Sequence, residues 1–200
     1  MEKIYRVGII GCGGISRAHA GGYLGIPNAK MVAVADVNEE NAKKFCQDYS
    51  VKKAYTDYVK MLESESLDIV SICTWPPLHS ELTVKSAEHG VKGILCEKPM
   101  ALNLKECDAM IEACDRAKCV LVIGHQRRFE AQYAKAKEVI TSGAIGDLIM
   151  IRHICRGDLL SDGTHSIDLI RFYADDPPIE WVFGQVDDRQ KNTRYGHDIE

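Results

Sequence analysis

Short apolar runs alternate with amphipathic stretches along the first 123 residues of the chain. The apolar runs cover residues 5–10, 31–35, 68–73, 93–96 and 120–123. Runs of this kind are typical of parallel strands that are buried on both faces of a sheet. The pattern therefore predicts a parallel sheet whose strands are joined by helices.

Polar residues and glycine mark where these helices begin and end. Asn38 is a suitable N-cap for a helix that follows it. A further helix follows His79 and stops at Gly90, and a first helix begins near residue 15. The helix that starts at Asn103 has Glu106 at the spacing of a capping box, although Ser or Thr is more usual at the first position. Strand–helix–strand alternation with short connections predicts a doubly wound α/β fold.

The pattern changes after Gly124. We expect a helix from about residue 128 to residue 141, a strand near 148–154, a helix near 164–173 and a strand near 181–186. The chain is thus predicted to contain a first domain over residues 1–124 and the first part of an α+β domain over residues 125–200. Two strands and two helices offer little sheet to pack against, so we expect the sequence to be the front part of a longer protein.

The composition narrows the function classes. Hydrophobic residues make up 46% of the chain and charged residues 27%, as in ordinary globular proteins. A net charge of −4 without a basic stripe argues against nucleic-acid binding. No apolar run is long enough for a membrane span and no signal-peptide pattern is present, so we expect a cytoplasmic protein. The eight cysteines form no CxxC pair, which favours reduced, mostly buried thiols and no metal site.

A glycine-rich segment, GCGGIS, lies between the first apolar run and the first helix. Gly11 permits a tight turn, and Gly13 lets the backbone approach a pyrophosphate, whose charge the helix N-terminus attracts. Ser16 stands where a third glycine is common and is still small enough for close helix packing. The expected cofactor-binding residues here are Gly11, Gly13, Gly14, Ile15 and Ser16. The motif is imperfect, and a plain tight turn is the alternative, but its place between strand and helix favours a Rossmann dinucleotide site.

Asp36 follows the second apolar run and lies 25 residues after Gly11 (36 − 11 = 25), close to the roughly 20 residues at which this motif expects an acidic residue. A carboxylate there accepts hydrogen bonds from the adenosine ribose hydroxyls and repels a 2′-phosphate. No Arg follows it in Val37 and Asn38. The sequence therefore favours NAD over NADP as the cofactor, with a turn or capping carboxylate as the alternative role for Asp36.

Two further segments follow apolar runs: TWPPLH over residues 74–79 and EKPM over residues 97–100. Together with the glycine-rich segment, and with GHQRRF and GTHSID further on, they resemble the Gfo/Idh/MocA family, named for glucose–fructose oxidoreductase and inositol dehydrogenase. The resemblance extends over the whole chain. It implies an N-terminal Rossmann domain, a C-terminal domain on a large and mainly antiparallel sheet, and a homo-oligomer formed through the open face of that sheet.

The resemblance also implies catalytic residues. Lys98 stands at the carboxyl end of a predicted parallel strand, where ligands bind in open α/β sheets. Its ammonium can stabilise a developing alkoxide, and Glu97 can help to hold it. By resemblance Lys98 is the catalytic-site lysine and His165 the acid or base, a task that suits an imidazole. A solvated lysine and a structural histidine are the alternatives.

The surroundings of His165 depart from the family pattern. The family often has an Asp four residues before this histidine, where this chain has Ser161, and Asp162 follows. On a helix both positions share a face with His165. Asp162 is therefore a candidate for orienting His165 or for binding a substrate hydroxyl, and equally for a mere N-cap. Ser161 is a possible substrate contact, and Asp168 is a second candidate partner or substrate contact.

Further candidates complete the expected site. Trp75 stands where the family has a proline and either covers part of the cofactor or packs against protein. His79 lies near the nicotinamide by resemblance, with a capping or packing role as the alternative. Gln126 and Arg127 follow the last apolar run and are expected to reach the nicotinamide or substrate hydroxyls. Outside the glycine-rich segment and Asp36, the expected cofactor contacts are Thr74, Trp75, His79, Glu97, Lys98 and Gln126.

These expectations combine into one leading function. The protein is expected to transfer hydride from a secondary hydroxyl of a sugar, cyclic polyol or sugar derivative to NAD. Two other functions stay open: an NAD-dependent glycoside hydrolase of the same fold, and an NAD-binding regulator without turnover. The pairing of Lys98 with His165 argues against the regulator, and Ser161 argues weakly for it.

Overall fold

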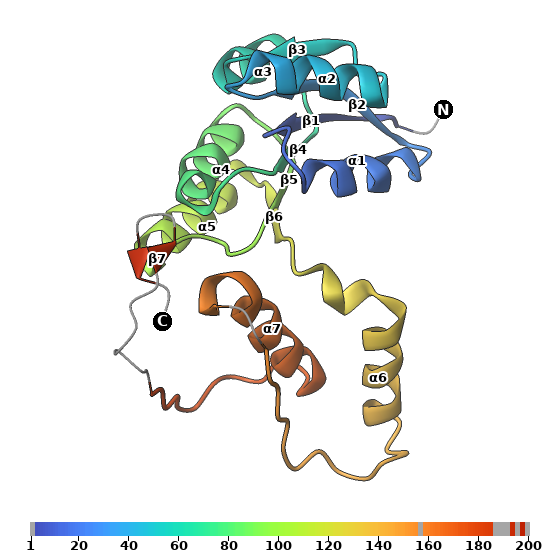
Figure 1. Cartoon of the computed structure of the whole chain (residues 1–200), viewed down its shortest axis with the longest axis vertical. Coiled ribbons are helices and arrows are strands. Elements are labelled where there is room, and N and C mark those ends of the chain that lie inside the picture. The colour runs from blue at the N-terminus through green and yellow to red at the C-terminus, as the bar shows by residue number, and fades with distance from the viewer. Residues whose placement is uncertain (1–2, 156–157, 186–192, 195–196, 199–200) are drawn as a thin grey trace. The chain divides into compact units, whose positions relative to one another are not determined.

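A six-stranded parallel sheet forms the framework of residues 1–124, the first of two compact units in the chain (Figure 1). Its strands are β1 (Tyr5–Ile10), β2 (Ala29–Ala35), β3 (Lys53–Tyr55), β4 (Ile69–Ile72), β5 (Gly93–Cys96) and β6 (Val120–Ile123). Their order is β3-β2-β1-β4-β5-β6, with parallel pairing throughout. This is the order of a doubly wound Rossmann sheet, so the predicted fold of the first part is confirmed. The computed structural model describes residues 3–155, 158–185, 193–194 and 197–198.

Helices connect the strands and cover both faces of this sheet. They are α1 (Ser16–Leu24), α2 (Glu39–Tyr49), α3 (Tyr58–Ser64), α4 (His79–Glu88) and α5 (Leu104–Ala117). Successive strand residues point to opposite faces. Val7 and Ile9 of β1 therefore belong to one buried cluster with residues of α1 and α2. Ile10 belongs to a second cluster, with residues of α3, α4 and α5.

Side-chain caps fix the starts of three helices. Asn38 accepts hydrogen bonds from the first-turn amides of α2, and Asp57 does the same for α3. Asn103 accepts from the Glu106 amide at the start of α5, so Asn38 and Asn103 are confirmed as N-caps. The carboxylate of Glu106 accepts from the Leu102 amide at 3.2 Å, one residue earlier than a standard capping box requires.

The apolar pattern does not predict β3 or α3. β3 is only three residues long and lies at the edge of the sheet, with Lys53 and Ala54 exposed. An edge strand of this length has too few buried side chains to produce a readable period. The elements are held by long-range contacts that sequence spacing does not reveal.

One such contact is the buried carboxylate of Glu65, just after α3. It accepts hydrogen bonds from Lys53 Nζ at 2.6 Å, from the Tyr55 hydroxyl at 2.7 Å and from Arg6 Nη2 at 3.0 Å. Burial alone raises the pKa of this carboxyl, but the hydrogen bonds from Lys53 and Tyr55 and the charges of Lys53 and Arg6 outweigh it. The net pKa of Glu65 is lowered. The ionised carboxylate thus joins β1 to β3 and the end of α3.

The second unit, residues 125–200, is described on its own. Its described elements are a 3₁₀ turn (Gln126–Phe129), α6 (Ala131–Thr141), a π-helical turn (Leu159–Gly163), α7 (Thr164–Tyr173), and the antiparallel pair β7 (Thr193–Arg194) and β8 (His197–Asp198). The helix expected over residues 164–173 is confirmed. The helix expected from residue 128 begins only at Ala131, because Glu130 has an extended backbone with ψ 136°.

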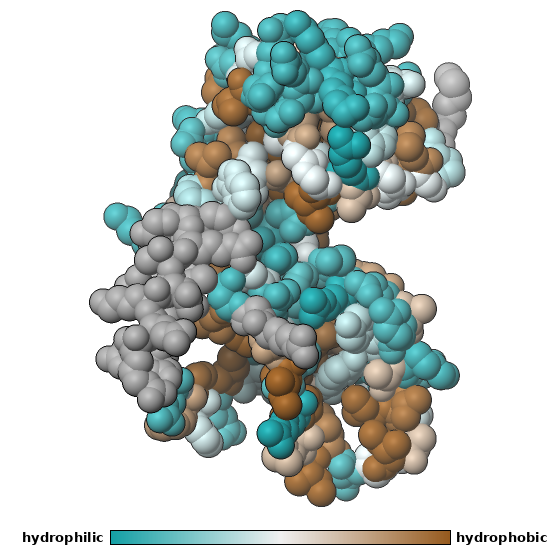
Figure 2. Space-filling view, in the orientation of Figure 1, coloured by the Kyte–Doolittle hydropathy of each residue, from teal (hydrophilic) through white to brown (hydrophobic). Residues whose placement is uncertain are grey.

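The two strands expected in this unit are absent from the described residues. Residues 148–154 and 181–185 have no regular structure, and residue 186 lies outside the described part of the chain. A strand is stable only beside another strand, and neither segment has a ladder partner among the residues described. Most of their apolar side chains are exposed. Figure 2 shows hydrophobic residues at the surface in the lower part of the view. Among the described residues, no helix is long and apolar enough to cross a membrane.

Candidate active site

A cavity of about 670 Å³ opens at the carboxyl edge of the sheet in the first unit. Residues at the ends of β1, β2 and β4 line it, together with the loops that follow these strands. Its walls include most of the expected cofactor residues: Gly11, Gly13, Gly14, Ile15, Asp36, Thr74 and Trp75. The carboxyl edge next to the first strand is where open α/β sheets bind dinucleotides.

The turn between β1 and α1 depends on Gly11. Its φ is +90°, a region that side chains disfavour, and a Cβ there would lie 2.7 Å from the carbonyl oxygen of Cys73. The backbone of this turn therefore packs directly against the end of β4. Only glycine satisfies both conditions, so Gly11 allows the turn to pack this closely against the end of β4.

The following residues leave room and amides for an anion. A Cβ built on Gly13 or on Gly14 would meet no protein atom within 4 Å. The start of α1 has no side-chain cap, unlike α2, α3 and α5, and Ser16 instead donates its hydroxyl to the Gly13 carbonyl at 2.6 Å. The amides at the start of α1 have no side-chain cap, and the two glycines before them carry no side chain that would block a ligand. These amides can therefore bind a pyrophosphate.

Asp36 links this turn to the end of β2. One carboxylate oxygen accepts a hydrogen bond from the Cys12 amide at 2.7 Å, and the other accepts from the Asn38 amide at 2.8 Å. These bonds fix the carboxylate at the wall of the cavity, where it keeps lone pairs for ligand hydroxyls. Burial raises the pKa of the Cys12 thiol to about 12, with a smaller effect from Asp36, so the thiol adds no negative charge to the turn.

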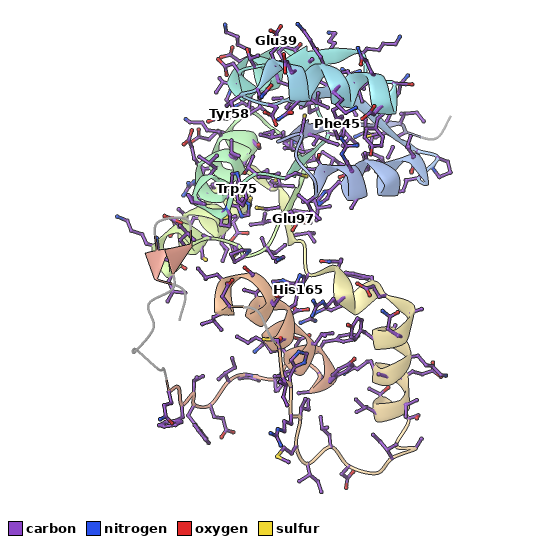
Figure 3. All side chains as sticks on the ribbon, viewed as in Figure 1. Glu39, Phe45, Tyr58, Trp75, Glu97 and His165 are labelled. Atoms are coloured by element: carbon purple, nitrogen blue, oxygen red, sulfur yellow. The ribbon has the colours of Figure 1, made fainter. Side chains whose placement is uncertain are left out.

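The loop after β4 and the start of α3 form a further part of the wall. Trp75 is 65% exposed and lines the cavity together with Tyr58 (Figure 3). Tyr58 donates a hydrogen bond from its hydroxyl to Glu81 Oε1 at 2.6 Å. Burial raises the pKa of the phenol, and the Glu81 carboxylate raises it further. The buried hydroxyl oxygen of Thr74 has no hydrogen-bond partner among the described residues. An aromatic wall and an unsatisfied hydroxyl are both features that a bound dinucleotide can use.

Glu97 lies at the end of β5, where it is 8% exposed (Figure 3). Its Oε1 lies 2.9 Å from His19 Nε2, and its Oε2 accepts a hydrogen bond from the Lys98 amide at 3.2 Å. Burial alone raises the pKa of this carboxyl, but the hydrogen bond and charge of His19, and then the amide and charge of Lys98, outweigh it and lower the pKa. Glu97 is thus held by protein groups at the base of Lys98.

His79 is fully buried at the start of α4. Its Nδ1 lies 2.8 Å from the Pro99 carbonyl oxygen and its Nε2 lies 3.2 Å from the Thr74 carbonyl oxygen. The ring therefore joins the loop after β4 to the loop after β5. This is the packing alternative for His79, and a direct contact with the nicotinamide stays an untested prediction.

In the second unit, His165 is 4% exposed near the start of α7. The His125 ring contacts its ring edge-on, with centroids 5.7 Å apart and planes at 88°. The turn before it is π-helical, since the Gly163 amide bonds to the Asp158 carbonyl five residues back. The spacing of a regular helix, on which Ser161 and Asp162 were placed on the face of His165, does not apply through this turn.

Residues near His165 in the sequence form hydrogen bonds and ion pairs with other side chains of the second unit. Ser161 donates both its amide and its hydroxyl to Asp158, each at 2.7 Å. Asp162 lies 3.9 Å from Arg127, and α7 has no side-chain cap, so Asp162 is not the N-cap of that helix. Gln126 is exposed in the preceding 3₁₀ turn.

Asp168 belongs to an ion-pair cluster. Arg128 donates from Nε to both carboxylate oxygens of Asp168 at 2.8 Å, and from Nη1 and Nη2 to Asp176 at 2.7 and 2.9 Å. The two hydrogen bonds, from Asp176 and then Asp168, raise the pKa of Arg128, and Arg128 in turn lowers the pKa of Asp176. With its carboxylate paired in this way, Asp168 joins the turn before α6 to α7.

Sequence reasoning missed several groups at these places. His19 gave no signal because its partner Glu97 lies 78 residues further along the chain. His125 lies in the GHQRRF segment, but the sequence assigns it no role, and the role of the Tyr58–Glu81 pair becomes visible only through its contact. Among the described residues, no cluster of His, Cys, Asp and Glu is arranged to hold a metal ion.

Known proteins resemble this chain in sequence and in fold. It is 33% identical over 192 residues to myo-inositol 2-dehydrogenase of Thermotoga maritima, covering 89% of this chain and 57% of the relative. It is 35% identical over 144 residues to D-apiose dehydrogenase of Paraburkholderia graminis, covering 72% and 38%. The crystal structure of myo-inositol 2-dehydrogenase from Lactobacillus plantarum matches with a TM-score of 0.78 at 26% identity, covering 86% and 56%. The chain spans about half the length of the curated relatives it matches.

The family itself is identified by a match to its sequence profile. The profile is described as an oxidoreductase family with an NAD-binding Rossmann fold, and it matches residues 5–125. That range contains the glycine turn, Asp36 and Lys98. The chain therefore belongs to the Gfo/Idh/MocA family of oxidoreductases and carries its NAD-binding Rossmann domain.

Proposed function

We propose that the protein is an NAD-dependent dehydrogenase that oxidises a secondary hydroxyl of a cyclic polyol, a sugar or a sugar derivative. The observation that carries the proposal is the cavity in which an open glycine turn faces a carboxylate held by two backbone amides. Similarity to an inositol dehydrogenase and to an apiose dehydrogenase supports a polyol or sugar as the substrate.

Residues of the first unit, together with Gln126 of the second, are proposed to bind different parts of NAD. The amides of Gly13, Gly14, Ile15 and Ser16 would hold the pyrophosphate, and Asp36 the adenosine ribose. Thr74, Trp75 and Gln126 would contact the remainder of the cofactor. His79 and Glu97 would support the protein loops that carry these contacts. When bound, NAD supplies the acceptor for hydride. The lack of any Lys or Arg among the residues that line the cavity favours NAD over NADP.

Two residues are proposed to act on the substrate hydroxyl. The ammonium of Lys98 donates a hydrogen bond to the substrate oxygen and so favours its alkoxide form. His165 accepts the hydroxyl proton on its imidazole, with His125 contacting its ring. Arg127, Asp162 and Ser161 remain candidate substrate contacts, and Asp168 a weaker one because Arg128 pairs with its carboxylate.

A substrate panel tests this function. Full-length protein is incubated with NAD and with stereoisomeric inositols, D-apiose, other sugars and matched glycosides, and NADH absorbance is followed. Growth of NADH with at least one free polyol or sugar is expected. Cleavage of a glycoside without net NADH would instead support a glycoside hydrolase. Calorimetric NAD binding without turnover of any compound would support a regulator.

The role of His165 has its own test. His165→Ala is expected to lower kcat about a hundredfold, because a positioned base contributes at least that factor, while the calorimetric NAD affinity stays unchanged. His89→Ala removes an exposed histidine of the first unit and serves as the control. Unchanged kcat in His165→Ala would remove His165 from the mechanism.

The proposal extends to assembly and location. We propose a homo-oligomer in the cytoplasm, on the strength of family resemblance and the composition of the chain. Light scattering on full-length protein measures the oligomeric state, and a monomer at micromolar concentration would overturn that part of the proposal.

A further inference from the structure

A buried chain of hydrogen bonds runs from α1 to the end of β5. The side chain of His19 is 8% exposed, and its ring lies between two groups. Nε2 lies 2.9 Å from Glu97 Oε1, and Nδ1 lies 3.2 Å from the hydroxyl of Ser71 in β4. The hydroxyl of Tyr23, one turn further along α1, lies 2.8 Å from the same Ser71 oxygen.

The direction of the bond between His19 and Glu97 follows from the carboxylate. An ionised carboxylate only accepts, so His19 donates from Nε2 to Glu97. The other ring nitrogen and the Tyr23 hydroxyl each share a hydrogen bond with the Ser71 hydroxyl. Hydrogen bonds at both ring nitrogens, to Glu97 and to Ser71, thereby fix the orientation of the His19 ring.

Glu97 is enclosed where this chain ends. A Cβ on Gly124, at the end of β6, would lie 3.1 Å from Oε1, so the absence of a side chain there leaves room for the carboxylate. The second oxygen accepts the Lys98 amide at 3.2 Å. Each Glu97 oxygen is therefore committed to a protein donor, and movement of the carboxylate would pull on the backbone from which Lys98 extends.

We propose that His19 is a positioning residue, which holds Glu97 so that Glu97 fixes the backbone of Lys98 at the catalytic edge of the sheet. The inference deepens the proposed function, on which the importance of Lys98 rests. His19 itself touches no substrate in this scheme. Its effect reaches the reaction only through Glu97 and Lys98.

Two substitutions of similar size separate this role from packing. In His19→Gln, the amide nitrogen can take the place of Nε2 and still donate to Glu97. In His19→Asn, the shorter amide can reach Ser71 but not Glu97. Both variants remove the ring, so loss of packing affects them alike. His89→Gln provides a control for replacing an exposed histidine.

The first measurement uses the full-length protein without cofactor. Hydrogen exchange of the Lys98 amide, followed by NMR, reports whether its bond to Glu97 persists. We expect exchange about tenfold faster in His19→Asn, since an anchoring hydrogen bond to a charged group is lost, and near-normal exchange in His19→Gln. Equal protection of Lys98 in both variants and the parent would overturn the proposal, whatever reaction the protein catalyses.

The second measurement separates kcat from cofactor affinity. If Lys98 is misaligned, kcat in His19→Asn falls about tenfold or more, while the calorimetric Kd for NAD changes less than about threefold, and His19→Gln restores most of kcat. A Kd for NAD that weakens as much as kcat falls would indicate general loosening and contradict positioning. If the protein turned over no substrate, only the proposed function would fail, because the exchange result stands by itself.

A third variant covers the case in which His19→Asn does not fold. Ser71→Ala removes the hydrogen-bond partner of Nδ1 with a small change in volume at a buried site. We expect exchange of the Lys98 amide to quicken about threefold or more as the His19 ring loses its fixed orientation. No change in Ser71→Ala, together with normal protection in His19→Gln, would refute the hydrogen-bond chain.

Discussion

Asp36 has both carboxylate oxygens engaged by backbone amides, one from the glycine turn and one from the turn before α2. The carboxylate therefore shapes the turn and also presents its charge to the cavity. The two roles separate on substitution, because an amide has only one accepting oxygen.

Asp36→Asn is expected to weaken NAD binding about tenfold, the cost of one hydrogen bond to a charged group. Preference for NAD over NADP should fall at the same time, since the repulsion of a 2′-phosphate is lost. Calorimetric titration with each dinucleotide measures both effects. Glu39→Gln, an exposed carboxylate of α2 paired with Lys43, is the control. An NAD affinity that stays within about twofold of the parent would show that Asp36 stabilises the turn but does not bind the cofactor.

At the scale of residues, sequence motifs locate those parts of the site that are close along the chain. The glycine turn and Asp36 line one cavity, as their spacing predicts. Long-range partners are invisible to spacing, so the pairing of His19 with Glu97 and of Arg128 with Asp168 could not be foreseen. The π-helical turn before His165 also breaks the regular spacing used to place Ser161 and Asp162.

Among the elements, the turn from β1 to α1 combines a structural glycine with two that border open space. The first is required by its φ and by the backbone of β4, whereas the others face the cavity. Stability and binding can thus be separated within one short segment.

Gly11→Ala is expected to destabilise the protein by about 3 kcal/mol, because a positive φ and a contact with backbone both penalise the new Cβ. Gly13→Ala should change the free energy of unfolding by less than about 0.5 kcal/mol yet weaken NAD binding strongly, since its methyl group takes the space for the pyrophosphate. Urea unfolding and calorimetry measure the two quantities. Equal destabilisation by both substitutions would disprove this division.

Edge elements show a different dependence on long-range contacts. Glu65 connects β3 and the end of α3 to β1, and its lowered pKa means that folding stabilises the ionised form. This contribution is fully present above the ordinary glutamate pKa of about 4.3, and it is lost as the pH falls through the lower value of the folded state.

Glu65→Gln is therefore expected to reduce the free energy of unfolding at neutral pH by about 2 kcal/mol, a modest value because Lys53 and Arg6 are half exposed. The difference from the parent should shrink in acid, over the window below about pH 4.3. Urea unfolding as a function of pH measures it. Glu112→Gln removes an exposed ion pair of α5 as the control. A difference that does not vary with pH would show that Glu65 acts without its charge.

The same reasoning explains which elements the pattern predicts. Central strands such as β1, β4 and β5 are buried and therefore apolar, so their runs are easy to read. β3 is short and lies at the edge, and it leaves no run. The apolar segments at 148–154 and 181–185 have strand-like composition without strand partners among the described residues, which composition alone cannot reveal.

For the whole molecule, two units carry different parts of the proposed reaction. The cavity for the dinucleotide lies within the first unit, together with Lys98. His165 and its neighbours belong to the second unit. Binding of NAD should therefore be possible to follow independently of the proposed base.

Hydrogen exchange with and without saturating NAD is expected to map this division. Protection should increase most in residues 10–15, 35–41 and 73–82, which contain most of the residues that line the cavity, because ligand binding opposes local opening there. α6 of the second unit serves as the internal reference, and Asp36→Asn at the same NAD concentration is the control. Protection confined to the second unit would place the dinucleotide elsewhere.

The exposed indole at the wall of the cavity makes the chain its own optical sensor. Trp75 is one of only two tryptophans in the sequence, and the other, Trp181, belongs to the second unit. NADH entering the cavity would quench the emission of Trp75 or receive its excitation energy, and a Trp181→Phe background would isolate that signal. Occupancy could then be read from light alone, without turnover, dyes or labels.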